Sequence, residues 1–257
     1  MEKELGILVI HGMGSQKEGF ADKMIDRVNR RVAKKFGLNA DKIAWNPVFW
    51  ANITEENQVD YLDRISSHNL RSFGIRNFIV KALGDAVAYQ KTDSSDNHTY
   101  EDINLVMKEA MASIFQQLGE DPTKPLMILA HSLGGVIMSN YIWDTRGDNN
   151  ITGFHNFETL KTIVTFGCNL PLFSFAYDEP KAIEVPGSQW FNYYDKHDIL
   201  GYPLKPISES YEQAITEEEE INSGGLFTSW NPLSHSSYWT DKDFVKRVSG
   251  HINQILQ

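Results

Sequence analysis

Cysteine is nearly absent from this sequence, with Cys168 the single one among 257 residues. One cysteine cannot form a disulfide within the chain, which excludes disulfide-stapled secreted scaffolds and favours a reducing compartment. Apolar runs of roughly 18 residues, the length that a membrane-spanning helix needs, are also absent. The N-terminus has a short apolar run that passes into a glycine-rich turn, which is unlike a secretory signal. We therefore expect a cytoplasmic protein without a transmembrane segment.

Positive charge is scarce relative to negative charge. The chain has 24 lysines and arginines against 34 aspartates and glutamates, a net charge of −10. A nucleic-acid binder needs a basic surface to neutralise phosphates, so this class of partner is not expected. Adhesion to anionic lipid by charge alone is disfavoured for the same reason.

Short buried strands and amphipathic helices alternate along the chain. Residues 5–10 form a continuous apolar run typical of a strand buried on both faces, and residues 17–35 carry apolar side chains at helical spacing. Residues 43–50 read as a second strand, in which Pro47 indicates an edge position or a break. Further strands are expected at residues 126–130, 162–166 and 190–194, and further helices at 100–118, from 134 to 143, and at 241–256. This alternation predicts an α/β fold with a mainly parallel sheet and helices on both faces.

The chain shows no internal repeat, no low-complexity linker and no shift in composition. We therefore expect a single domain over residues 1–257, with residues 55–99 and 204–232 as lid-like insertions over one rim. The acidic run at residues 217–220 is interpreted as a solvated helix face or the edge of a lid.

The strongest catalytic signal is the segment LMILAHSLGG at residues 126–135. A hydrophobic strand runs into His131-Ser132-Leu133 and a helix follows at once, which is the context of a nucleophile elbow. The turn is so tight that the residues two before and two after the serine must be small, and Ala130 and Gly134 meet this demand. A serine that merely caps a helix is the alternative.

A second signal is the glycine-rich turn His11-Gly12-Met13-Gly14 at the end of the first strand. In serine hydrolases of this architecture such a turn supplies one backbone N–H to the oxyanion hole, and the residue after the nucleophile supplies the other. The candidate donors are therefore the N–H groups of Met13 and Leu133. An ordinary strand-ending turn is the alternative, and a phosphate loop is disfavoured because no Gly-Lys-Ser/Thr follows. His11 is interpreted as a structural hydrogen-bonding residue rather than a base.

These motifs resemble the α/β-hydrolase superfamily in its serine-esterase and lipase-like branch. The resemblance lies in LVIHGMG at residues 8–14, LMILAHSLGG at 126–135 and TIVTFGCNL at 162–170, in the usual order. Segments at residues 47–50, 84–89 and 193–204 are similar to lipase-like and phospholipase-like hydrolases. The similarity covers most of the chain and is patchy between residues 91 and 123.

The resemblance implies a catalytic acid after the nucleophile and a histidine after the acid. Asp198 is the favoured acid because an aliphatic residue follows it and Pro203 is near. Asp195 is the reserve, since its neighbour Lys196 offers it a solvent-side partner, and Asp178 is the next candidate. A solvated loop carboxylate is the alternative for each of them.

Two histidines follow Asp198 in the chain. His235 precedes the last helix, where this fold delivers its base, and is favoured over His251, which we expect on a helix surface. His197 belongs to the same loop as Asp198 and is poorly placed to reach Ser132.

These residues predict a serine hydrolase that cleaves a carboxylic ester with a hydrophobic or lipid-like acyl group. Acyl transfer, thioester cleavage and a non-catalytic binding protein on the same scaffold remain open. No cofactor and no metal are expected, because Asp93, Asp96 and His98 match no known cation loop and read as a polar linker. Cys168 reads as a small buried thiol. The oligomeric state is left open.

Overall fold

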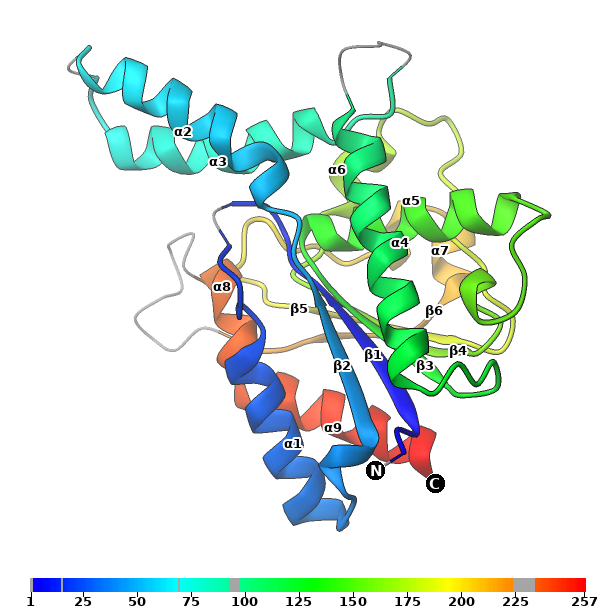
Figure 1. Ribbon diagram of the computed structural model, residues 1–257. Coiled ribbons are helices and arrows are strands. Elements are labelled where there is room, and N and C mark those ends of the chain that lie inside the picture. Colours follow the sequence, from blue (N-terminus) through cyan, green and yellow to red (C-terminus); the bar gives the residue numbers. More distant parts are fainter. Residues whose placement is uncertain (1, 15, 69, 93–97, 224–233) are drawn as a thin grey trace.

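The computed structural model describes residues 2–14, 16–68, 70–92, 98–223 and 234–257 (Figure 1). Within these residues the strands form one six-stranded sheet in the order β2-β1-β3-β4-β5-β6, and every pairing is parallel. The strands are β1 (Leu5–Ile10), β2 (Ile43–Val48), β3 (Leu126–His131), β4 (Leu160–Phe166), β5 (Gln189–Tyr194) and β6 (Ile215–Glu220). The predicted α/β fold with a parallel sheet is confirmed.

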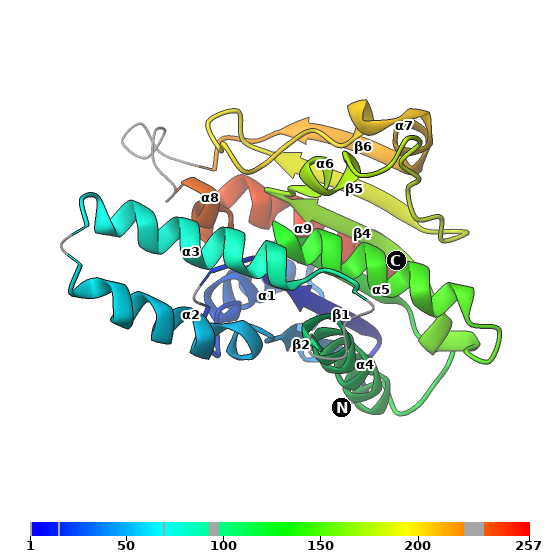
Figure 2. The same ribbon diagram turned by 90° about the horizontal axis from the view of Figure 1, so that it is seen from above.

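Helices cover both faces of the sheet (Figure 2). The longer ones are α1 (Asp22–Phe36), α2 (Asn52–Ser66), α3 (Phe73–Ala88), α4 (Thr99–Gln117), α5 (Leu133–Gly147) and α9 (Lys242–Leu256). The short ones are α6 (Leu170–Ser174), α7 (Glu209–Ala214) and α8 (Ser234–Ser237), with 3₁₀ turns at Ala40–Lys42, Gly153–Asn156, Lys205–Ile207 and Tyr238–Thr240. None of the helices in the described ranges is long and apolar enough to cross a membrane.

The core consists of two apolar layers, one on each side of the sheet. Along β1, Leu8 and Ile10 face the layer that contains α4 and α5, whereas Ile7 and Val9 face the layer that contains α1 and α9. Side chains of a strand alternate between the two faces, so a strand covered on both sides must be apolar throughout. This is why residues 5–10 lack the polar alternation of a half-exposed strand.

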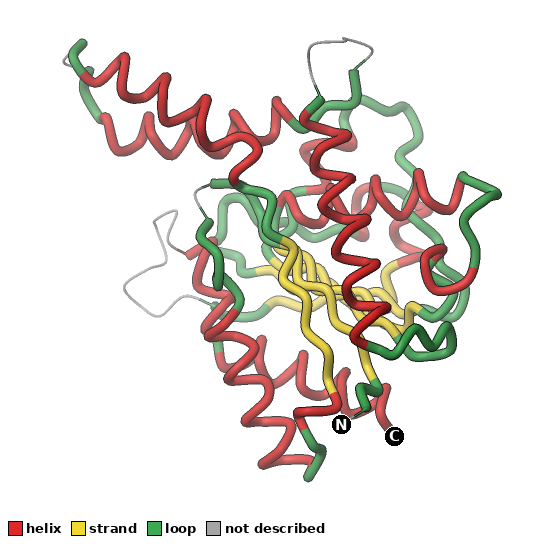
Figure 3. Tube along the Cα trace, in the orientation of Figure 1, coloured by secondary structure: helices red, strands yellow, loops and turns green. Residues whose placement is uncertain are grey.

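The helices α2 and α3 form a hairpin that projects from the body of the molecule (Figures 1 and 3). The hairpin begins just after β2, at the carboxyl end of the sheet, and overlaps most of the stretch 55–99 expected as the first insertion, starting three residues before it. Apolar side chains on α3 remain exposed, among them Leu83 at 58% and Val87 at 72%. The division into a domain with insertions stays a prediction.

Of the second expected insertion, residues 204–232, the part at 224–232 lies outside the described residues, and the described part contains a strand. Its acidic run lies in β6, which pairs with β5 and is the last strand of the described sheet, rather than in a helix or a lid edge. Glutamate has low strand propensity, so the sequence pattern contained no strand signal here. Edge strands tolerate charged side chains, and Glu219 of β6 forms an ion pair with Arg247 of α9. At the opposite edge, β2 contains Pro47 as expected.

Candidate active site

The candidate catalytic residues meet at the carboxyl edge of the sheet. The turns after β1, β3 and β5 all lie at this edge because the strands are parallel, and α8 lies beside them. In open α/β sheets this edge is the usual ligand-binding position.

Ser132 lies at the sharp turn between β3 and α5. Its backbone has φ 54° and ψ −124°, a conformation that costs a non-glycine residue about 1–3 kcal/mol and that clusters at functional sites. The turn also needs Gly134, since a Cβ atom there would lie 2.7 Å from the carbonyl oxygens of Ile10 and His11. The side chain of Ser132 is fully buried. The local geometry is therefore that of a strained nucleophile elbow.

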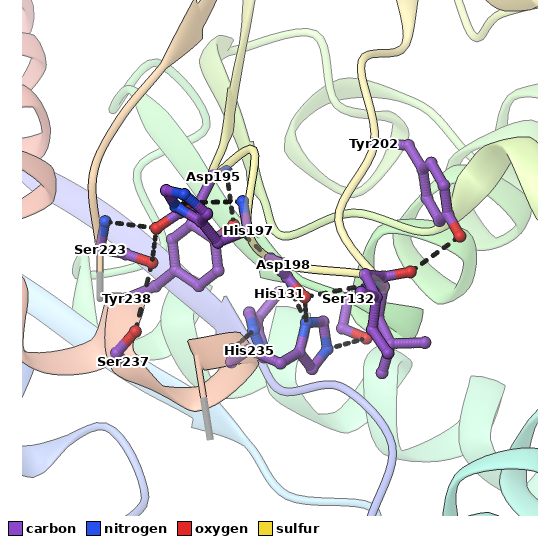
Figure 4. Close-up of polar contacts among 12 residues, drawn as sticks. His131, Ser132, Asp195, His197, Asp198, Tyr202, Ser223, His235, Ser237 and Tyr238 are labelled. Atoms are coloured by element: carbon purple, nitrogen blue, oxygen red, sulfur yellow. Dashed lines mark hydrogen bonds and ion pairs between the residues drawn. The ribbon is translucent and has the colours of Figure 1, made fainter. Parts of the chain in front are cut away.

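Ser132, His235 and Asp198 form a continuous hydrogen-bonded relay (Figure 4). The Ser132 hydroxyl lies 2.7 Å from Nε2 of His235, and Nδ1 of His235 lies 2.9 Å from Oδ2 and 3.0 Å from Oδ1 of Asp198. An ionised carboxylate only accepts, so Nδ1 carries the proton and Nε2 is free to accept one from the serine. The relay therefore has the tautomer that a general base requires.

Tyr238 also contacts Asp198, and sequence reasoning did not identify it. Its hydroxyl donates to Oδ2 of Asp198 at 3.0 Å and accepts the backbone N–H of Asp195 at 2.9 Å. Burial, and next the negative charge of Asp198, raise the pKa of Tyr238, so this donor keeps its proton. The N–H of Leu200 donates to Oδ1 of Asp198 at 3.0 Å. The only signal in the sequence was the position of Tyr238, three residues after His235.

Asp195 is buried as deeply as Asp198 but bonds to a different group of residues. Its carboxylate accepts the N–H and hydroxyl of Ser223 at 2.8 and 3.0 Å, and the N–H of His197 at 2.9 Å. The expected solvent-side partner Lys196 instead forms an ion pair with Glu220 of β6 at 3.1 Å. Asp195 therefore fastens the loop after β5 to the segment after β6.

His131 supports the histidine of the relay from below and was also missed. Its Nε2 donates to the backbone carbonyl of His235 at 2.8 Å. Complete burial, and next the proximity of His235, lower the pKa of His131 well below the usual value, so the ring stays neutral. The signal available in the sequence was its place next to Ser132 in the elbow.

The turn after β1 lies directly against Ser132. A Cβ atom at Gly12 would lie 2.4 Å from Cβ of Ser132, so only glycine fits. His11 is fully buried, and burial lowers its pKa to about 4. Nε2 of its neutral ring accepts the N–H of Trp50 at 3.1 Å, so Nδ1 is the protonated nitrogen and donates to the carbonyl of Gly12 at 2.7 Å. The expected structural role of His11 agrees with these bonds.

The other candidates lie outside the relay. Asp178 is on an exposed loop. His251 is buried in α9, contrary to the expected surface position, and its Nε2 lies 2.8 Å from the Tyr193 hydroxyl; burial lowers its pKa to about 4. Cys168 is fully buried, and burial raises the pKa of its thiol to about 12, which removes it as a nucleophile.

No cluster of metal-binding side chains occurs among the residues that the structure describes. The segment with Asp93, Asp96 and His98 reads in the sequence as a polar linker rather than a cation loop. Asp93 and Asp96 lie outside the described residues, and His98 is exposed.

A cavity of about 500 Å³ lies along α5, between α6 and residues 89–91. It begins at Val136, one helical turn beyond Ser132, and extends to Asp144. Its aromatic lining consists of Tyr89, Tyr100, Trp143, Phe173, Tyr177 and Tyr211. The cavity therefore offers aromatic side chains together with polar and charged ones, among them Lys91, Asp144 and Glu179, and it begins one helical turn from the elbow.

The family described as "Putative serine esterase (DUF676)" matches residues 71–203, which is just over half of the chain. The matched stretch includes α3, the elbow with Ser132 and the loop with Asp198, and it ends before His235. No curated protein matches the sequence.

Proposed function

The chain belongs to this serine-esterase family, and on that premise we propose that it hydrolyses a carboxylic ester through an acyl-enzyme on Ser132. The resemblance to the serine-esterase branch of the α/β hydrolases is thereby confirmed at the level of family and fold. The substrate and the roles of the individual residues belong to the proposal.

The relay from Ser132 through His235 to Asp198 is the observation that carries this proposal. Its two hydrogen bonds measure 2.7 and 2.9 Å and join three segments that are far apart in the sequence. A serine hydroxyl is a weak nucleophile until a neighbouring base accepts its proton. A buried serine that bonds to a correctly oriented histidine has the features of an activated nucleophile.

In the acylation step, Oγ of Ser132 attacks the carbonyl carbon of the ester while Nε2 of His235 takes the hydroxyl proton. The tetrahedral intermediate collapses when the bond to the alcohol oxygen breaks, and the imidazolium gives its proton to that leaving oxygen. Asp198 holds the ring in place and stabilises its positive charge. Water then attacks the acyl-enzyme by the same route in reverse, releasing the acid and restoring the serine.

The backbone N–H groups of Met13 and Leu133 are the proposed oxyanion hole. Leu133 is the first residue of α5, and the first N–H groups of a helix have no acceptor within it. Met13 follows Gly12, whose lack of a side chain lets the turn approach Ser132 closely. Such donors act on charge that develops only in the transition state, and each contributes roughly 10²–10³ to kcat.

For the substrate we propose an ester with an apolar acyl group. The support is the group of aromatic side chains that line part of the cavity beginning one turn beyond Ser132. Burial of each methylene is worth about 0.8 kcal/mol at most, so a chain that fills part of this cavity gains affinity with each carbon.

The direct test is steady-state hydrolysis of p-nitrophenyl esters by wild type and Ser132→Ala. We expect kcat to fall by roughly 10⁴–10⁶ in the variant, as in other serine hydrolases. Ser249→Ala is a matched control, because Ser249 is equally buried but lies in α9, where its hydroxyl donates to the carbonyl of Val245. Equal loss in both variants, or none in Ser132→Ala, would contradict the proposal.

A further inference from the structure

Asp85 of α3 is a buried carboxylate that the proposed mechanism does not use. Its side chain is 2% exposed. Oδ2 accepts the backbone N–H of Gly14 at 2.7 Å, and Oδ1 accepts the Thr54 hydroxyl at 2.6 Å and the Gln58 amide at 2.5 Å. The carboxylate thus joins three segments: α3, α2 and the turn after β1.

The three donors to Asp85 are all uncharged. Burial, its largest influence, raises the pKa of the carboxyl, and the bonds from Thr54, Gly14 and Gln58 oppose that rise. A buried carboxylate without a cation costs several kcal/mol unless hydrogen bonds satisfy its oxygens. A hydrophobic residue would fill this place at lower cost, so the carboxylate calls for an explanation beyond packing.

The bond to Gly14 fixes the backbone on one side of Met13, while His11 fixes it on the other. The N–H of Gly14 belongs to the peptide that follows Met13, and the carbonyl of Gly12, which accepts from His11, belongs to the peptide that precedes it. In a trans peptide the carbonyl and the N–H point in opposite directions. Holding the carbonyl of Gly12 therefore also sets the direction of the Met13 N–H.

We propose that Asp85 is a positioning residue that holds the turn after β1 so that the Met13 N–H can stabilise the oxyanion. This rests on the proposed function, in which Met13 is an oxyanion donor. Asp85 touches neither the nucleophile nor its base, and it acts only through the backbone of Gly14. Because Thr54 and Gln58 lie on α2, the same contact fastens the α2–α3 hairpin to the catalytic turn.

The close packing of the two hairpin helices supports this role. A Cβ atom at Gly84 would lie 3.1 Å from Nε2 of Gln58, which is tighter than ordinary contact. The missing side chain lets the Gln58 amide reach the neighbouring carboxylate. Gly84 and Asp85 therefore act together: Gly84 leaves room for Gln58 of α2 to bond to the Asp85 carboxylate, and this carboxylate accepts the N–H of Gly14 in the turn.

The experiment compares Asp85→Ala and Asp85→Asn with wild type in ester hydrolysis and in binding of an aryl trifluoromethyl ketone. Addition of Oγ of Ser132 to this ketone forms a hemiketal oxyanion, and the serine proton passes to His235, so its affinity reports on the oxyanion hole. We expect Asp85→Ala to lower kcat by roughly 10–100-fold with KM nearly unchanged, less than the roughly 10²–10³ for loss of an oxyanion donor, because the Met13 N–H is displaced rather than removed. The inhibition constant should rise in the same proportion. Asp85→Asn should lose less, because its amide oxygen can still accept from Gly14.

Asp60→Asn is the control for removing a carboxylate from the hairpin, since Asp60 is exposed on α2. We expect it to match wild type in both measurements. An unchanged kcat in Asp85→Ala, or a lower kcat with unchanged ketone affinity, would overturn the positioning role. If Asp85→Ala does not fold, Asp85→Asn decides by the same comparison of kcat with ketone affinity. A wild-type protein that neither hydrolyses esters nor binds the ketone through Ser132 would overturn the proposed function itself, and this role with it.

Discussion

The two turns that meet at Ser132 are built in different ways. The elbow after β3 is local: the strand, the strained serine, its small flanking residues and the start of α5 lie within the ten residues 126–135. The turn after β1 depends on side chains that are distant in sequence, because Trp50 orients His11 and Asp85 holds Gly14. The conformation of the elbow is thus set by residues adjacent in sequence, whereas the conformation of the turn after β1 is set by tertiary contacts. Substitutions far from the reacting atoms should therefore disturb the turn after β1 more than the elbow.

Among the residues around Ser132, the largest effect is expected at Asp198, the proposed catalytic acid. Asp198→Asn should reduce kcat by roughly 10³–10⁴, because an amide cannot hold His235 in the accepting tautomer or stabilise its charge. Asp195→Asn should cost less than about tenfold, since that carboxylate bonds to Ser223 and His197 rather than to the relay. Circular dichroism should show both variants folded. If Asp195→Asn is the inactive variant, the acid lies three residues upstream of our assignment.

The next largest effect is expected where the two turns touch. Gly12→Ala would place a Cβ atom 2.4 Å from Cβ of Ser132, so the turn must move away from the nucleophile. We expect kcat to fall by roughly 10²–10³, as for loss of one oxyanion donor. Gly147→Ala is a matched control, because a Cβ atom there meets nothing within 4 Å. Full activity in Gly12→Ala would contradict the proposal that the Met13 N–H is part of the oxyanion hole.

The local character of the elbow explains why so much of the site was predictable from the sequence. Ser132 could be identified from its small neighbours and from the strand and helix around it. His235 and Asp198 were then chosen by chain order, and the structure brings these three side chains into contact. Tyr238 and His131 could not be chosen in this way, because their roles depend on hydrogen bonds formed only after β4, β5 and α8 have packed together.

Asp85 and β6 were missed for related physical reasons. Asp85 lies in a helix whose apolar residues show mixed spacing, so its burial could not be deduced from periodicity. The glutamates of β6 have low strand propensity, and tertiary contacts account for their place at the sheet edge: the pairing with β5 and the ion pairs of Glu219 with Arg247 and of Glu220 with Lys196. By contrast, residue types alone predicted two features correctly. The apolar run of β1 indicated a strand buried on both faces, and Pro47 indicated that β2 lies at an edge of the sheet.

Two buried histidines, His11 in the turn after β1 and His251 in α9, should make the stability of the fold sensitive to acid. Burial lowers the pKa of both His11 and His251 from 6.5 to about 4. Between these pH values the unfolded chain binds more protons than the folded one. The contribution of each neutral histidine to the free energy of unfolding is therefore fully present above pH 6.5 and is lost as the pH falls toward 4. Each histidine should account for a loss on the order of 3 kcal/mol, at about 1.4 kcal/mol per pKa unit.

His251→Gln separates the two contributions. This variant should lose less stability than wild type between pH 6.5 and 4, while its kcat at pH 7.5 should be unchanged because α9 lies outside the site. Urea unfolding at pH 7.5, 6 and 5 measures the difference. Parallel losses in the two proteins would show that His251 does not contribute to acid sensitivity.

The smallest effect is expected from the acyl chain. Activity on p-nitrophenyl esters should rise from acetate toward medium chains, by at most about fourfold per methylene. Trp143→Ala should flatten this rise, because Trp143 lines the cavity along α5. A steady decline in activity beyond acetate would indicate a small polar acyl pocket and would show that the cavity does not bind the acyl chain.

In the proposed mechanism Ser132 is the activated nucleophile. The most direct measurement is intact mass and peptide mapping after treatment with a fluorophosphonate, which forms a stable adduct only with an activated nucleophile. We predict one adduct, on Ser132, in wild type and none in Ser132→Ala. An adduct of equal yield in the variant, or one mapped to another residue of the wild-type protein, would contradict the account.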